Sequence, residues 1–211
     1  MKLNLQIVVN TLKDIRNYMF PIKRITNKFK KITSAEELKS FVHERSAHVT
    51  QTTLYGYIKT RIGSRYTIMF EDKTFSDSIN IAKWNIYVTA LADCTFYVYS
   101  YLIDKKKFKK ENNEANKIYE QILKSEKNNG LEDGIYQSAL IDFQKRLKEI
   151  NWDLYHQDNP FYNSSQALYK WAPISENLKI LDKEIVLNSI KLKWNLVENE
   201  FKDFTKNLKF N

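Results

Sequence analysis

Glycine, proline and cysteine are scarce in this chain of 211 residues, which contains four, three and one of them. Sheet folds built from short strands need a turn every few residues, so the shortage of glycine and proline predicts long helices. The single cysteine, Cys94, excludes a disulfide within the chain and is compatible with a reducing compartment. The sequence therefore favours an all-helical protein held together by its core.

Motifs for metal binding and conventional catalysis are also lacking. His43 and His48 are five residues apart, so on a helix they point about 140° away from each other. A zincin helix instead needs histidines at i and i+4 around a glutamate. There is no paired Glu-x-x-His, no G-x-S-x-G elbow and no phosphate-binding loop of the P-loop type. We therefore expect no metal and no cofactor.

Positive charge is what the chain does contain, with a net charge of +9. Up to residue 35 the only acidic residue is Asp14, and a second basic cluster, DKKKFKK, spans residues 104–110. Such clusters attract phosphates of lipids or nucleic acids, or simply form a solvated face. We predict an anionic-surface contact by Lys23, Arg24, Lys28, Lys30 and Lys31.

The first residues mix charged and apolar side chains without a small-residue cleavage site, which argues against a secretory signal. We expect a cytoplasmic protein, with peripheral contact to a membrane surface as an open alternative. Apolar residues follow helical spacing from Leu5 to Met19, and Pro21 interrupts that pattern. We divide the chain into a basic amphipathic N-terminal segment, residues 1–33, and a helical bundle domain, residues 34–211.

The clearest helix start is the sequence SAEE, in which Ser34 and Glu37 can form a capping box. That helix is expected to end near Ile62, before Gly63. A second long helix is expected over residues 77–103, capped by Ser76 or Asp77. Shorter helices are predicted over 113–125, 136–152 and 166–171.

The last predicted helix begins near Ser175 and runs almost to the end of the chain. Its apolar seam keeps the 3-4 spacing of a packed helix. The seam consists of Leu187, Ile190, Trp194, Val197, Phe201, Phe204 and Leu208. With no internal repeat, the pattern predicts an all-α fold: a single helical bundle with two long central helices and a long C-terminal helix.

Two neighbouring faces of the helix over residues 34–62 carry few charges, which indicates that most of this helix is buried. Small side chains, which allow close helix packing, line one face. They are Ser46, Val49, Thr53, Gly56 and Thr60. The other face is a polar ridge formed by Arg45, His48, Thr52, Tyr55 and Lys59.

Asp93 is the one acid in an otherwise apolar stretch, residues 86–103. A buried carboxylate without a partner costs several kcal/mol, so we expect it to be paired or protonated. Arg45, His48 and Lys59 of the ridge are the expected partners. Two interpretations stay open: a structural polar lock, or a pKa-shifted acid in a cleft. The stretch is shorter than the ~20 residues that span a membrane, so a core helix is favoured.

The stretch FVHERSAHVTQTTLYGYIKTRIGSRY, residues 41–66, together with MFED and SINIAK, residues 69–72 and 78–83, resembles a small family of uncharacterised alphaproteobacterial proteins. Some members of that family carry the label esterase. The resemblance implies that residues 41–82 form the functional core, and it assigns no catalytic residues.

The expected function is binding without catalysis. We predict an accessory protein that recognises an anionic surface or a protein partner, through the basic segment or the groove beside the ridge. The alternative is an esterase-like hydrolase with an unconventional site between the two long helices, built from His48, Tyr55, Lys59 and Asp93. A second alternative is an RNA-binding accessory protein. The ligand and the oligomeric state stay open.

Overall fold

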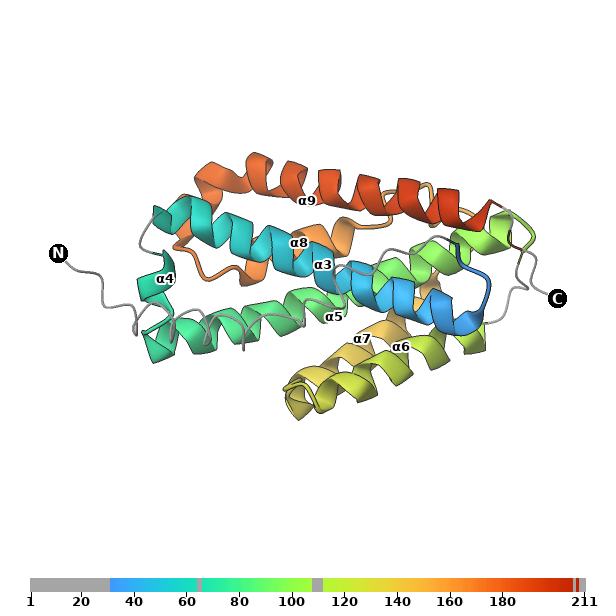
Figure 1. Ribbon diagram of the computed structural model, residues 1–211, viewed down its shortest axis with the longest axis horizontal. Helices are drawn as coiled ribbons and strands as arrows, with labels where there is room; N and C mark the ends of the chain where they lie inside the picture. The colour runs from blue at the N-terminus through green and yellow to red at the C-terminus, as the bar shows by residue number, and fades with distance from the viewer. Residues whose placement is uncertain (1–30, 64–65, 108–111, 207, 209–211) are drawn as a thin grey trace.

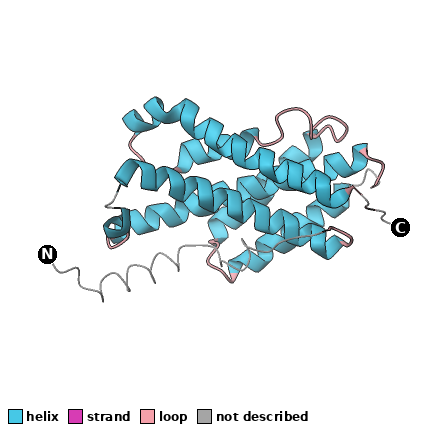
Figure 2. Cartoon of the chain, turned by 45° about the horizontal axis from the view of Figure 1, so that its top comes forward, coloured by secondary structure: helices cyan, strands magenta, loops and turns pink. Residues whose placement is uncertain are grey.

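The computed structural model describes residues 31–63, 66–107, 112–206 and 208, and these residues form a bundle of helices without strands (Figures 1 and 2). The elements are α3 (Ala35–Ile62), α4 (Tyr66–Met69), α5 (Lys73–Asp104), α6 (Asn112–Lys127), α7 (Asp133–Glu149), α8 (Tyr162–Trp171) and α9 (Glu176–Thr205). The predicted all-α bundle with two long central helices and a long C-terminal helix is confirmed. The predicted helical stripe over residues 5–19 lies outside the described residues.

The ends of α3 are set by local chemistry. Ser34 accepts a hydrogen bond from the Glu37 N–H, and the Glu37 carboxylate accepts from the Ser34 N–H, which completes the predicted capping box. At the other end Gly63 has φ +65°, a left-handed conformation that favours glycine, and its N–H donates to the Lys59 carbonyl. Both predicted boundaries of this helix are confirmed.

The second long helix, α5, starts earlier than predicted. Asp72 caps it by accepting from the Phe75 N–H at 3.0 Å, so the expectation of a cap at Ser76 or Asp77 is wrong. Ser76 lies inside the helix, where its hydroxyl donates to the Phe70 carbonyl at 2.8 Å. Asp72 precedes Ser76 and Asp77 by only four and five residues, and all three are residue types that can cap a helix.

At the centre of the bundle, α5 packs against α3, α6, α7 and α8. Of the described helices it is the one long and apolar enough to cross a membrane, judged by length and composition. However, 83% of its most apolar window of 18 residues is buried inside the protein. That burial agrees with the expectation of a core helix.

The long C-terminal helix α9 covers α3 and α8 along one side of the bundle (Figure 1). Its predicted seam faces the core: Ile190, Trp194, Val197 and Phe201 are at most 3% exposed. The Trp194 ring stacks on Phe161 with centroids 4.1 Å apart. The helical period of the seam therefore placed the inner face of α9 correctly.

The small-residue face of α3 packs over only part of its length. Ser46, Val49 and Thr53 are buried, and the Ser46 hydroxyl, which donates to the Val42 carbonyl, lies 3.4 Å from the Ala90 carbonyl of α5. Farther along the same face, residues 56 and 60 are exposed. Three of the five residues of the predicted face are thus buried, and Ser46 lies where α3 approaches the α5 backbone closely.

Candidate interaction site

The polar ridge of α3 does not meet Asp93, contrary to expectation. Arg45, 6% exposed, instead reaches α9 and forms a two-point ion pair with Glu200. Its Nε donates to Oε2 at 2.6 Å and its Nη2 to Oε1 at 2.9 Å. The planar guanidinium suits such bidentate pairing with a carboxylate. Arg45 therefore fastens α3 to α9.

The rest of the ridge does not form a cluster. His48 is half-buried, and burial together with the nearby Arg45 charge lowers the pKa of its imidazole. Thr52 donates to the His48 carbonyl at 2.8 Å, and the Tyr55 ring stacks on Phe70 with centroids 6.1 Å apart. Lys59 is exposed. These side chains serve separate local contacts.

Asp93, fully buried, is held by α7, α8 and the loop between them. Its Oδ1 accepts from Arg146, and the Tyr155 hydroxyl lies 3.3 Å from the same oxygen. Its Oδ2 accepts from the Ser164 N–H in the first turn of α8 at 2.7 Å, at the positive end of the helix dipole. Burial raises the pKa of Asp93, and the Arg146 charge and the Ser164 hydrogen bond oppose that shift.

This arrangement supports the interpretation of Asp93 as a structural lock. Both carboxylate oxygens have partners, and those partners come from elements that must meet α5 for the bundle to close. Arg146 also donates to the Tyr155 hydroxyl at 2.9 Å, and that hydroxyl donates to the Pro160 carbonyl at 2.8 Å. The sequence identified Asp93 as a residue needing a cation, but Arg146, 53 positions away, carried no signal of its own.

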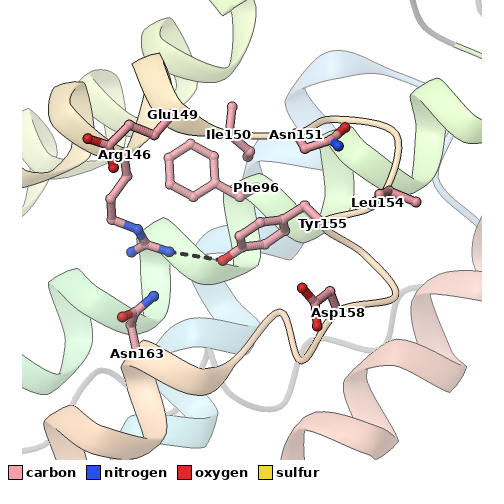
Figure 3. A pocket seen from close by; sticks show the side chains of 9 residues that line it. All are labelled: Phe96, Arg146, Glu149, Ile150, Asn151, Leu154, Tyr155, Asp158 and Asn163. Carbon is pink, nitrogen blue, oxygen red and sulfur yellow. Dashed lines mark hydrogen bonds between the residues drawn. The ribbon is translucent and has the colours of Figure 1, made fainter.

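A cavity of about 320 Å³ opens beside this lock (Figure 3). Arg146 and Tyr155 point toward each other on its wall, next to the Phe96 ring. Two carboxylates, Glu149 and Asp158, line the same cavity. Because the guanidinium is already bound to Asp93 and the remaining charges are acidic, this cavity is poorly suited to an anion.

One serine and one histidine do meet, although spacing along the chain did not predict it. The Ser100 Oγ lies 3.0 Å from the His156 Nδ1, and the His156 Nε2 lies 3.7 Å from the Asp104 carboxylate. The residue types are those of a serine-hydrolase triad. The geometry differs, because Ser100 is fully buried within α5 and its hydroxyl donates to the Trp152 carbonyl at 2.6 Å.

With its only proton given to a carbonyl, the Ser100 oxygen can only accept from His156. It accepts from the His156 backbone N–H at 3.0 Å. The contact with Nδ1 then requires that Nδ1 carry the ring proton, as it does in one neutral tautomer of histidine. Such an imidazole donates to the serine and cannot act as its base. Ser100 and His156 thus fix the loop after α7 onto α5.

The basic clusters fall partly outside the described residues. Of the predicted anionic-surface residues only Lys31 is described, and it is exposed. In the second cluster Lys105 pairs with Asp104 at 2.8 Å, and Lys107 donates to the Thr205 and Lys206 carbonyls. A cation at the C-terminal end of α9 complements the helix dipole. Part of this second cluster therefore serves the fold.

The most unusual surface lies on the outer side of α9. Half of the large exposed apolar side chains of the described residues, six of twelve, belong to this helix. Five of the six recur at helical spacing on the side opposite the core seam. This outer stripe consists of Leu178, Leu181, Ile185, Leu192 and Leu196, with exposures of 37, 75, 70, 64 and 64%.

The outer stripe was missed at the level of sequence, although its signal was present. Leu181 and Ile185 are four residues apart, as are Leu192 and Leu196, with a heptad between Ile185 and Leu192. The inner seam, which contains three aromatic residues, dominates the pattern and accounts for one apolar face. Two opposite apolar faces on one helix require two packing partners.

No family model, curated protein or solved structure matches the chain. The resemblance to the alphaproteobacterial family therefore stays a prediction. Within the described part of the chain, no three histidine, cysteine or carboxylate side chains are grouped so as to hold a metal ion. The candidate site that the geometry favours is the outer stripe.

Proposed function

We propose that this protein works by binding another protein through the outer stripe of α9. The observation that carries the proposal is a row of five apolar side chains facing solvent on a helix whose other side is already packed. They expose on the order of 500 Å² of apolar surface, which lies within the ~300–600 Å² of the largest apolar patch on a typical monomer, a patch that is often functional.

Energetics favour a partner for this face. Burying one Leu or Ile side chain stabilises a complex by ~1.5–3 kcal/mol, so five of them offset much of the ~4–15 kcal/mol that association costs. The isolated exposed Ile141 of α7, 68% exposed, lacks such neighbours on its own helix. A single exposed side chain needs no explanation, whereas a spaced row does.

The charges around the stripe favour a protein over an anionic membrane. Exposed Glu184 and exposed Lys191 lie along one edge of the stripe, and Asn188 lies between them. An interfacial helix on an anionic membrane instead carries mainly lysine and arginine beside its apolar face. Mixed charge beside an apolar row is the pattern of helix–helix recognition.

The hydrolase alternative has weaker support. Asp93 is occupied by Arg146 and Ser164, and His48 and Lys59 have no described contact with it. Ser100 is fully buried and has given its proton to a carbonyl. The geometry therefore supports binding without catalysis.

Site-specific photo-crosslinking in cells that produce the protein tests the proposal. A benzophenone amino acid at Leu192 is expected to give one discrete adduct, which the second-site change Leu181→Glu removes. The same probe at Ile141 is the matched control and is expected to give none, because Ile141 is exposed to a similar extent but lies outside the stripe. Equal adducts from both positions, or none from Leu192, would contradict the proposal.

The anionic-surface contact is a separate prediction, which rests on the clustered cations of residues 23–31. Flotation with vesicles tests it. We expect the protein to float with anionic but not neutral vesicles, and to be released by salt, which screens exposed charges. Replacing the five cations by glutamine should abolish flotation, while Leu192→Glu should leave it unchanged. If the protein never floats, this contact does not exist.

A further inference from the structure

We infer that the partner of the outer stripe is a second copy of this chain, packed against it in antiparallel orientation. The inference rests on the proposed function and names the partner of the same face. It is carried by three features of α9: the symmetry of the apolar row, the order of the charges on one edge, and the polar residues at its middle.

The first feature is symmetry about one point. The pair Leu181 and Leu196 and the pair Ile185 and Leu192 share one midpoint, between Asn188 and Ser189. An isologous dimer places the same patch of both copies around a two-fold axis, so that residue i contacts j and j contacts i. With the axis at that midpoint, Leu181 of one copy lies opposite Leu196 of the other, and Ile185 lies opposite Leu192, on both sides of the axis.

The second feature is a charge pair on one edge of the row. Exposed Glu184 and exposed Lys191 are separated by a heptad, so they lie on the same edge of the helix. In a two-fold antiparallel pair the same edges of the two helices adjoin. Glu184 then faces Lys191 of the second copy, twice.

The midpoint of this charge pair falls between Leu187 and Asn188, one residue from the midpoint of the apolar row. One register therefore aligns both the apolar row and the opposite charges. A parallel pair would instead place this edge against Asp182 and Ser189, which offer no cation to Glu184. Asp182 is moreover already bound to Arg61.

The third feature is the interruption of the row at its centre. Asn188 and Ser189, both exposed, occupy the middle where another apolar residue would fit the spacing. On the axis, Asn188 meets its own copy, and a polar residue at one interface position fixes register and orientation in paired helices. On both sides of this polar centre the interface consists of the apolar residues of the stripe.

The size of the face agrees with a reversible dimer. Two stripes of on the order of 500 Å² each bury about 1,000 Å² in total, the lower limit of specific interfaces. Glu184 and Lys191 carry opposite charges, so this register does not bring like charges of that edge together. A concentration-dependent monomer–dimer equilibrium is expected.

Sedimentation equilibrium of the full chain over a wide range of concentration tests the partner's identity. Wild type is expected to dimerise, and Leu192→Glu to weaken the dimer at least a hundredfold. Ile141→Glu, the matched exposed apolar position outside the stripe, should leave the dimer unchanged.

The charge pair has its own test. Glu184→Lys should weaken the dimer by about tenfold, since two exposed pairs become repulsive. Adding Lys191→Glu to that variant should restore the wild-type affinity. If the double variant dimerises no better than the single one, the proposed register is wrong.

Disulfide trapping separates the orientations. Asn188→Cys, next to the axis, is expected to crosslink with its own copy under mild oxidation. Asn177→Cys lies on the same edge but roughly 35 Å from its own copy in the antiparallel pair, at 1.5 Å per residue, so it should not. Cys94 is fully buried and provides no competing thiol at the surface. No crosslink at Asn188→Cys, or a crosslink at Asn177→Cys as strong as the one at Asn188→Cys, would contradict the antiparallel register and overturn the inference.

Failure of this inference can be told from failure of the proposed function. A protein that stays monomeric at every concentration is not its own partner. If the photo-adduct at Leu192 then has a mass other than twice that of the chain, protein binding at the stripe stands with a different partner. If neither dimer nor adduct forms, both proposals are wrong.

Discussion

Asp93 and the outer stripe of α9 are both out of place by ordinary rules of burial, in opposite senses. One is a carboxylate in an apolar core, and the other is a row of apolar side chains in water. Inside the protein, Arg146 and Ser164 satisfy the carboxylate completely. On the surface no described element covers the stripe.

The difference separates a structural role from an interaction role. A polar group that folding has already satisfied contributes to stability and offers little to a ligand. An apolar face left open after folding can gain free energy only from another molecule. Changes at the two regions should therefore affect different measurements, stability in one and association in the other.

The largest contrast in stability is expected between two residues of α9 itself. Ile190→Ala, at a position 0% exposed, should lower the free energy of unfolding by about 2–5 kcal/mol because it leaves a cavity. Leu192→Ala, at 64% exposed, should change it by less than about 0.5 kcal/mol. Urea denaturation at a concentration where the chain is monomeric checks both, and equal losses would mean that the stripe is buried within the monomer.

A somewhat smaller loss of stability is expected when Asp93 is changed. Asp93→Asn should lower the free energy of unfolding by about 3 kcal/mol, because it leaves the Arg146 charge without its counter-ion in a largely buried place. The photo-adduct from Leu192 should persist in this variant. Glu200→Gln, which removes the counter-ion of Arg45 from a carboxylate 35% exposed, is the control and should cost no more than about 1 kcal/mol.

If Asp93→Asn were no more harmful than Glu200→Gln, the role of Asp93 as a lock would be refuted. If instead the variant were stable but lost the Leu192 adduct, the separation between stability and association would fail.

The smallest effect is expected in the pH dependence of stability. Burial lowers the pKa of His156, with the Asp104 carboxylate opposing the shift. Below pH ~6.5, the ordinary histidine pKa, the unfolded chain therefore takes up a proton that the folded chain binds more weakly. The free energy of unfolding then decreases as the pH is lowered. Part of this fall should disappear in His156→Gln.

Urea denaturation at neutral and mildly acidic pH measures this slope. His48, whose pKa is also lowered by burial, should preserve the rest of it in the variant. A slope of the same size in wild type and His156→Gln would show that the imidazole is protonated equally in both states.

Local chemistry explains which parts of the fold were predictable. The capping box at Ser34, the stop at Gly63 and the apolar period of α9 depend on residues within a few positions of one another, so the sequence alone was sufficient. The start of α5 was placed four residues too late, because several adjacent residues can cap and only one does.

The candidate site was much less predictable. The polar ridge from Arg45 to Lys59 was correctly placed on one helix, but the partners assigned to it were wrong. Arg45 pairs with a residue 155 positions away, and Asp93 with one 53 positions away. A pairing across such separations depends on which helices become neighbours, and helical periodicity contains no information on that choice.

The sequence by itself determined the helices, their faces and the need of Asp93 for a partner, since propensity, spacing and desolvation act at the level of the residue and its near neighbours. Only the tertiary structure decided that Arg146 pairs with Asp93, that Ser100 meets His156, and that no described element covers the outer stripe of α9. Each of those outcomes depends on how α5, α7, α8 and α9 pack together, because a helix can turn only one of its faces to the core.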